Sequence, residues 1–77
     1  MSKNQSLLLI QTAKLLKEIR LEAGLSQEKL ARKSGIDRTF ISGIERCNRN
    51  ITLNTLDCLL KALEIESEDF LIRLASL

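Results

Sequence analysis

The sequence contains no histidine, proline, tryptophan or tyrosine, and its only aromatic residues are Phe40 and Phe70. The missing histidines remove the commonest general base and the commonest metal ligand. With so few aromatic side chains, leucine and isoleucine must form the core, which suits helix-on-helix packing better than a sheet. A chain of 77 residues without histidine or a glycine-rich phosphate loop is therefore not expected to be an enzyme.

Cysteine is also scarce, because Cys47 and Cys58 are the only two in the chain. No histidine completes a set of metal ligands with them, so we expect no metal site and no cofactor. A disulfide between them is the alternative, but a helical chain without a secretory signal is typical of a reduced cytoplasmic protein. The apolar run at residues 7–10 is too short to cross a membrane. We expect a cytoplasmic protein with no membrane partner and no small-molecule ligand.

The net charge is only +2, but the charges are unevenly distributed along the chain. Residues 1–25 carry a net +2 and residues 26–50 a net +3, whereas residues 51–77 carry a net −3. A basic front and an acidic back are typical of a protein with one side facing a polyanion. Solvated charge runs give the same pattern, so the charges alone leave both interpretations open.

Apolar spacing predicts an all-α protein, with five helices in one domain over residues 1–77. The first three helices are expected at residues 6–23, 26–34 and 38–46, and the other two begin near residues 52 and 67.

Capping residues support these boundaries. Gly24 and Gly35 are expected to end the first and second helices. The later helices are expected to be capped by Ser26, Asp37, Thr52 and Ser67. An apolar stripe is expected on the fourth helix at Leu53, Leu56, Leu60 and Leu63.

Residues 27–46 have the spacing of a helix-turn-helix. Ala31 lies where two helices joined by a short turn come closest, and Gly35 can take the positive φ that opens the turn. Ile41 and Ile44 can anchor the second of these helices on the first. A plain helical hairpin in a small bundle is the alternative interpretation.

The outer face of the predicted third helix favours DNA reading over the plain hairpin. The residues expected to point outward, with no partner inside the protein, are Arg38, Thr39, Phe40, Ser42 and Arg46. Arginine can bind guanine through two hydrogen bonds, serine and threonine can bind bases or phosphates, and a ring can contact a thymine methyl group.

The segment LSQEKLARKSGIDRTFISGIER resembles the helix-turn-helix of Cro/CI-type (XRE-like) DNA-binding proteins, from about residue 16 to residue 70. DRTFISGIERCNRNIT is most similar to the controller proteins of bacterial restriction–modification systems, which are small dimeric transcription regulators. The resemblance implies a compact, lambda-repressor-like five-helix fold. Those proteins often carry a tyrosine where this chain has Phe40, so an apolar contact must replace any bond from a hydroxyl to phosphate.

The resemblance also implies a role for each matching residue. Base readers are expected at Arg38, Thr39, Phe40 and Ser42. Phosphate contacts are expected at Gln27, Arg46, Asn48, Arg49 and Asn50. Arg20 and Glu45 match positions that often form an ion pair between the first helix and the recognition helix.

The leucine-rich back third, at about residues 59–77, is the expected dimerisation side. Its apolar residues are Leu59, Leu63, Ile65, Phe70, Leu71, Leu74 and Leu77. The alternative is that they close the protein's own core over residues 7–10. A two-fold homodimer would place two recognition helices about 34 Å apart and so predicts a palindromic double-stranded DNA operator.

Three functions remain open from the sequence. The protein is expected to be a transcriptional regulator that controls a restriction–modification system. A phage-type or chromosomal repressor of the same family is the alternative within DNA binding. An antitoxin-like protein-interaction module is the alternative outside it, and duplex binding separates the two classes.

Overall fold

The computed structural model describes residues 6–77 and contains five α-helices and no strand within that range. They are α1 (Leu7–Glu22), α2 (Gln27–Ser34), α3 (Arg38–Glu45), α4 (Leu53–Ala62) and α5 (Ser67–Ala75). The all-α prediction is confirmed, and the observed helix ends agree with the expected ones to within a residue or two.

Side chains cap four of the five helices at their N-terminal ends. The hydroxyl groups of Ser6, Ser26 and Thr52 accept hydrogen bonds from amides one turn into α1, α2 and α4, at 3.0 Å each. Asp37 does the same for α3, where its carboxylate accepts from the Thr39 amide at 3.2 Å. These bonds satisfy amides that have no partner inside the helix, and so they fix where each helix begins.

The fifth helix differs from the prediction. Ser67 is its first helical residue, and Glu66 occupies the cap position without a side-chain hydrogen bond. Ser67 is therefore not the cap. Glu68 and Asp69 lie in the first turn, where negative charges interact favourably with the helix dipole.

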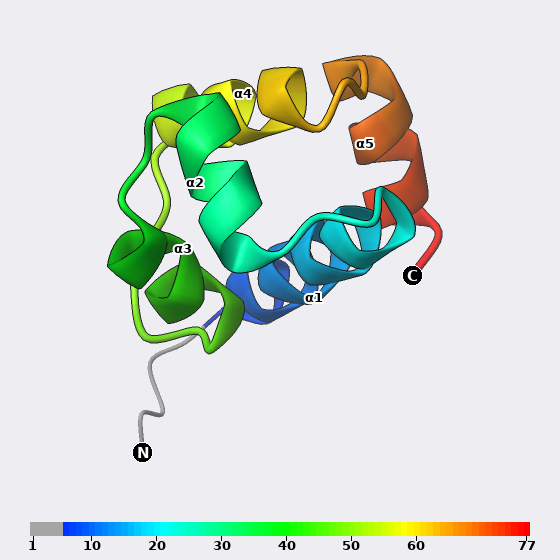
Figure 1. Ribbon diagram of the computed structural model, residues 1–77. Helices are drawn as coiled ribbons and strands as arrows, with labels where there is room; N and C mark the ends of the chain where they lie inside the picture. Colours follow the sequence, from blue (N-terminus) through cyan, green and yellow to red (C-terminus); the bar gives the residue numbers. More distant parts are fainter. Residues whose placement is uncertain (1–5) are drawn as a thin grey trace.

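The five helices contact one another in a closed cycle, so that α1 packs on α3 and α5, while α4 packs on α2 and α5. The remaining main contact joins α2 to α3. Figure 1 shows α1 and α4 on opposite sides of this cycle, with α5 joining their far ends. The arrangement leaves α2 and α3 together at one end of the molecule.

A single apolar core lies inside this cycle, and every helix contributes to it. Its largest fully buried side chains are Phe70, Leu15, Ile41, Ile44 and Leu59. No buried side-chain nitrogen or oxygen atom within residues 6–77 lacks a hydrogen-bond partner. Helices α2 and α3 therefore rest on a core in which every buried polar side chain of residues 6–77 has a hydrogen-bond partner.

One expected core position and three expected interface positions are wrong. Leu53 does not join the apolar stripe of α4, because 83% of it is exposed and Leu59 is buried instead. The helical period predicts on which face of a helix a side chain lies. It does not predict which turns of that face are covered by another helix. Leu59, Leu63 and Phe70 are buried in the protein's own core and cannot form a dimer surface, whereas Leu71 and Leu77 are more than half exposed.

An exposed ion pair joins the last helix, α5, to the end of the first helix, α1. Arg73 of α5 donates two hydrogen bonds to the Glu22 carboxylate at the end of α1, at 3.1 and 3.0 Å. These bonds lower the pKa of Glu22 and raise the pKa of Arg73 from their usual values. Because both groups are exposed, solvent screens the attraction.

Candidate DNA-binding face

The turn between α2 and α3 depends on Gly35. Its φ is +75°, in the left-handed region, and its amide donates to the Ala31 carbonyl at 2.8 Å. An added Cβ would meet nothing within 4 Å, so it is the backbone conformation rather than space that favours glycine here. Ile41 and Ile44 then hold the inner face of α3 against the core.

The N-terminal turn of α3 presents Arg38 and Thr39 to solvent. Both residues are exposed, and neither side chain makes a hydrogen bond or ion pair with the rest of residues 6–77. An arginine and a threonine without a partner, held on a fixed helix, can both donate hydrogen bonds to base edges. These two side chains lie where the sequence predicted the leading base readers.

Ser42 and Arg46 are also on the outer side, but they bind each other. Nη1 of Arg46 donates to Oγ of Ser42 at 2.6 Å, one helical turn away. The expectation that these side chains have no partner inside the protein is therefore wrong for this pair. The bond joins the end of α3 to its middle and holds the Arg46 guanidinium beside the helix.

Phe40 is half-buried, packs against the core, and lies beneath the Arg49 side chain. The guanidinium carbon of Arg49 is 5.4 Å from the centre of the ring, a distance typical of a cation–π contact. Phe40 is thus less available to a thymine methyl group than the sequence predicted. Arg49 was expected only to contact phosphate, but here it also fastens the loop after α3 to the recognition helix.

Gly43 makes this position of Arg49 possible, and sequence reasoning missed it. A Cβ added at Gly43 would lie only 2.6 Å from Cγ of Arg49. A glycine inside a short helix weakens the helix by roughly 0.5–1 kcal/mol relative to alanine. The presence of a glycine at such a position therefore indicates that another group approaches the helix closely. That signal was present in the sequence, but it did not identify the group that approaches.

The loop that follows α3 carries the other expected phosphate contacts. Asn48, Arg49 and Asn50 are all exposed. The loop begins at Cys47, a residue with a positive φ of 60°, and the Asn48 amide donates to the Gly43 carbonyl at 2.8 Å. The loop therefore turns back against α3 and brings three polar side chains close to the end of that helix.

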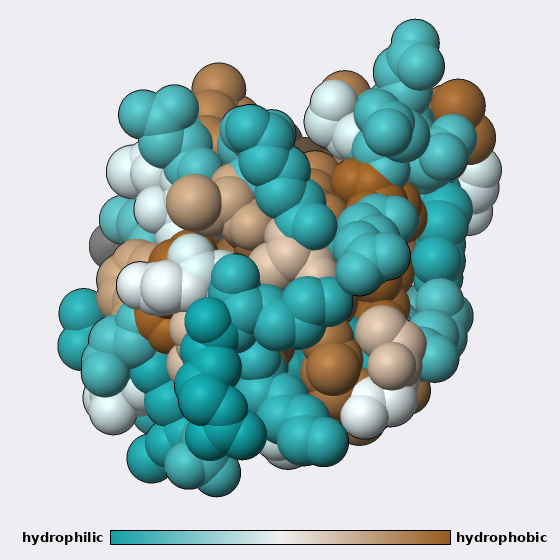
Figure 2. All heavy atoms as spheres, turned by 45° about the horizontal axis from the view of Figure 1, so that its top comes forward, coloured by the Kyte–Doolittle hydropathy of each residue, from teal (hydrophilic) through white to brown (hydrophobic). Residues whose placement is uncertain are grey.

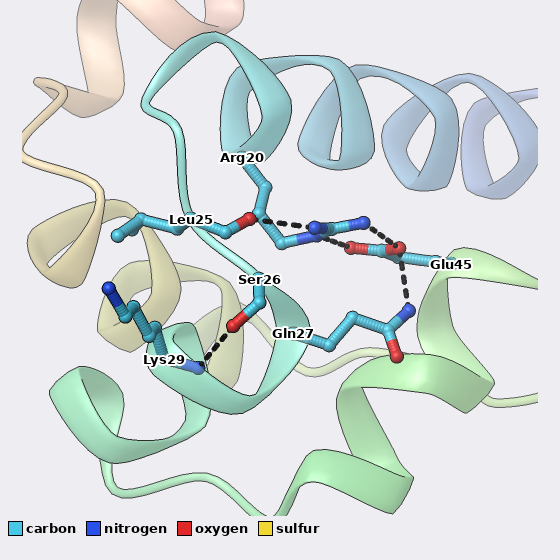
Figure 3. A network of polar contacts seen from close by, with 6 residues as sticks. All are labelled: Arg20, Leu25, Ser26, Gln27, Lys29 and Glu45. Atoms are coloured by element: carbon cyan, nitrogen blue, oxygen red, sulfur yellow. Dashed lines mark hydrogen bonds and ion pairs between the residues drawn. The ribbon is translucent and has the colours of Figure 1, made fainter.

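Behind this face, Arg20 and Glu45 form a buried ion pair (Figure 3). Nε of Arg20 donates to Oε2 of Glu45 at 2.6 Å, and Nη2 donates to Oε1 at 3.0 Å. Only 8% and 5% of the two side chains are exposed. The third arginine donor, Nη1, binds the Leu25 carbonyl at 2.8 Å, so the pair fixes α1, α3 and the segment before α2 together.

Gln27, the first residue of α2, joins the same network. Its Nε2 atom donates to Oε1 of Glu45 at 2.9 Å. The sequence predicted this side chain as a phosphate contact, but one of its two amide hydrogens is already used inside the protein. The other hydrogen, and the backbone amides of Gln27 and Glu28, remain for an anion at this helix end, whereas the Lys29 amide is used by the Ser26 cap.

Residues 6–77 contain no cluster of cysteine and carboxylate side chains that could hold a metal ion. None of the helices in this range combines the length and apolar character needed to cross a membrane.

Comparison with known families identifies the class of protein. A helix-turn-helix family model (HTH_3) matches residues 16–71, and the chain belongs to this XRE-type family of DNA-binding regulators. The resemblance noted in the sequence is thereby confirmed.

Within the family, the chain is similar to control proteins. Control protein C.SmaI of Serratia marcescens is 51% identical over 49 residues, which are 64% of this chain and 58% of that protein. Control protein C.BamHI of Bacillus amyloliquefaciens is 43% identical over 56 residues, 71% of this chain and 69% of that protein. The match thus spans less than two thirds of C.SmaI.

Solved structures of the restriction–modification controller protein C.Esp1396I have the same fold. The wild-type protein is 46% identical, with a TM-score of 0.91 over 94% of this chain and 92% of its own. Its tetramer bound to a natural operator of 35 base pairs matches with a TM-score of 0.91 and 46% identity, over 94% of this chain and 95% of its own. Other structures of that protein carry substitutions at three successive residues, an arginine, a threonine and a tyrosine.

Proposed function

We propose that this regulator binds a palindromic DNA operator as a homodimer and controls a restriction–modification system. The observation that carries the proposal is the pair of exposed side chains Arg38 and Thr39 at the start of α3, which have no partner within residues 6–77, in a helix-turn-helix resting on a packed core. The similarity to control proteins supports the biological role.

Base recognition is assigned first to Arg38 and Thr39. They stand in this chain's one run of arginine, threonine and an aromatic residue, the same residue types that were substituted in C.Esp1396I. Phe40 and Ser42 are the second pair of base readers. Ser42 must share its hydroxyl with Arg46, and Phe40 can offer a base only the edge of a half-buried ring.

Phosphate contacts are assigned to both ends of the helix-turn-helix. The Gln27 side chain and the backbone amides of Gln27 and Glu28 form one anion-binding end. Arg46, Asn48, Arg49 and Asn50 form the other, where two guanidinium groups and two amides lie near the end of α3. Contacts at both ends would fix the position of α3 in the major groove, while the bases specify the sequence.

A dimer is proposed because the molecule exposes large apolar side chains around one groove. This groove, of about 640 Å³, is bordered by the start of α1, residues 47–52, the start of α4, and α5. Its border includes Asn48, Arg49 and Asn50, so the proposed dimer covers the leucines of the groove and leaves these three polar side chains to DNA. Leu8, Leu53 and Leu71 line it and are each more than half exposed. Figure 2 shows apolar surface, in brown, between teal polar side chains on the side that carries α4.

A second copy of the chain is the proposed occupant of this groove. A two-fold interface uses the same patch on both subunits, so it needs a projection and a recess side by side. Leu53 supplies the projection, since 83% of it is exposed at the edge of the groove. The interface that we propose therefore consists of the leucines around the groove. It does not include Leu59 and Phe70, which the sequence suggested but which are buried.

Binding to a labelled palindromic duplex, measured by gel shift at increasing salt, tests the proposed function. Each phosphate that the protein neutralises contributes about −0.9 to the slope of log affinity against log salt. We expect a steep salt dependence and a complex that contains two protein chains. Absence of duplex binding at low salt would favour the protein-interaction module instead.

A further inference from the structure

The side-chain amide of Gln27 has a fixed orientation in this structure. Its nitrogen points to the Glu45 carboxylate, with Nε2 and Oε1 2.9 Å apart. The reverse orientation would place two acceptor oxygens against each other, because an ionised carboxylate can only accept hydrogen bonds. The Gln27 oxygen is therefore directed away from Glu45, as Figure 3 shows. The second hydrogen of Gln27 is thus carried on a nitrogen whose position is set by its hydrogen bond to Glu45.

We propose that Glu45 is a positioning residue for DNA binding, which holds the Gln27 amide so that it donates to a backbone phosphate. The inference rests on the proposed function, since it assumes that the α2 end binds a phosphate. It assigns to Glu45 a task beyond the ion pair. A carboxylate near DNA orients a donor toward a phosphate without contacting DNA itself.

The ion pair with Arg20 makes this arrangement possible. A carboxylate that is 95% buried would carry a large desolvation penalty without a charged partner. Arg20 supplies that partner with two hydrogen bonds, and its third bond, to the Leu25 carbonyl, keeps the guanidinium in place. The acceptor for Gln27 is consequently rigid, and it presents a neutral pair to the DNA side.

The network also joins the two ends of the helix-turn-helix. Gln27 is the first residue of α2 and Glu45 is the last residue of α3. The bond between them fixes the distance from the phosphate donor to the base-reading helix. A small rotation of α3 would thus also move the phosphate donor, which couples base reading to backbone contact.

Two variants separate positioning from a purely structural role. Gln27→Met keeps the length of the side chain and removes its donors. The double variant Arg20→Met with Glu45→Met replaces the buried pair with apolar side chains of similar length, a change that is often neutral or stabilising in other proteins. The double variant should remain folded, and it leaves Gln27 present but without its acceptor.

The readout is the affinity for operator duplexes in which single phosphates are replaced by uncharged methylphosphonate. At the phosphate bound by Gln27, we expect the replacement to weaken wild-type binding about tenfold, typical of a hydrogen bond to a charged group. For Gln27→Met, the same replacement should weaken binding only about threefold, because the backbone amides at the start of α2 still donate to that phosphate. The double variant should behave like Gln27→Met.

A folded double variant that retains the tenfold effect at that phosphate would overturn the inference, because Gln27 would then bind phosphate without Glu45. Glu28→Gln is the matched control, since it removes a carboxylate from the same turn, but an exposed one whose single ion pair within residues 6–77 is with Arg32. It should retain the wild-type pattern. Failure of the wild-type protein to bind any duplex would instead overturn the proposed function.

If the double variant does not fold, hydrogen exchange in the wild-type protein tests the inference. In the operator complex, both hydrogens of the Gln27 side-chain amide should exchange slowly with water in nuclear magnetic resonance spectra. One should be protected by Glu45 and the other by phosphate. Rapid exchange of either hydrogen would overturn the inference.

Discussion

The proposed DNA-binding face and the proposed dimer groove differ in how their outward side chains are supported. On the proposed DNA-binding face, neighbouring groups hold some of the polar side chains, as in the pairs Ser42–Arg46 and Phe40–Arg49, while Arg38 and Thr39 stay without a side-chain partner within residues 6–77. Around the groove, Leu8, Leu53 and Leu71 are exposed and lie at the edge of a recess. A polar surface can be arranged in advance by hydrogen bonds within one chain, whereas an apolar surface of this kind is covered only by another apolar surface.

Removal of the support behind the DNA-binding face should have the largest effect on stability. Glu45→Ala leaves the Arg20 guanidinium buried without a charge partner, and we expect a loss of about 3–5 kcal/mol in the free energy of unfolding. Chemical denaturation followed by circular dichroism measures it. Glu64→Ala, which breaks an exposed pair with Lys33, is the control and should change stability by less than about 1 kcal/mol. Equal losses in both variants would contradict the account.

A charge placed at the edge of the groove should break the dimer without harming the fold. Each buried leucine contributes about 1.5–3 kcal/mol, and a two-fold interface contains two copies, so Leu53→Asp should weaken dimerisation at least about a hundredfold. Analytical ultracentrifugation measures the change. Leu21→Asp is the control, since Leu21 is also exposed but does not line the groove. An unchanged dimer in Leu53→Asp would place the interface elsewhere.

Loss of Arg38 should affect specificity more than stability. We expect Arg38→Ala to weaken binding to the selected operator by about 1–3 kcal/mol and to relax discrimination at one base pair. Competition binding against operators with single base changes measures both quantities. Equal weakening on operator and random DNA would make Arg38 a phosphate contact. The unfolding free energy should stay within about 0.5 kcal/mol of wild type, because the side chain is exposed.

The exposed pair of Glu22 and Arg73 should show the smallest effect. The pKa of Glu22 is lowered in the folded protein, so its contribution is present above the usual carboxylate range. That contribution is lost as the pH falls through the lowered pKa. We therefore expect Glu22→Gln to destabilise the protein slightly at neutral pH and low salt, and not at all below the lowered pKa. A pH series of melting temperatures measures this, and a difference that grows toward acid would contradict it.

The sequence predicted most of the fold because short-range chemistry determines where these helices begin and end. Ser26, Asp37 and Thr52 cap the helices that they were expected to cap, and Gly35 makes the turn. Ser67 failed as a cap because the preceding Glu66 has the extended backbone of a cap residue. A rule that reads side-chain type alone cannot distinguish two adjacent candidates.

The candidate site was predicted as a set of residues and, apart from the Arg20–Glu45 ion pair, not as a set of contacts. Residue type and helical spacing gave the outward residues, such as Arg38 and Thr39. The bonds that tie Gln27 to Glu45, and the contact of Arg49 with Phe40, join residues from different elements of the fold. Such contacts depend on how helices and loops pack, which a periodic pattern does not specify. The exposure of Leu53 was missed for the same reason.

Selection of bound duplexes from a random library tests the central claim most directly, because it examines DNA binding, symmetry and base preference together. The account predicts enrichment of two inverted half-sites whose centres are about one DNA turn, roughly 34–36 Å, apart. It also predicts that Arg38→Ala loses the preference at one position of each half-site. Enrichment of a single unsymmetrical site, or of no sequence, would contradict recognition of a palindromic operator by a homodimer.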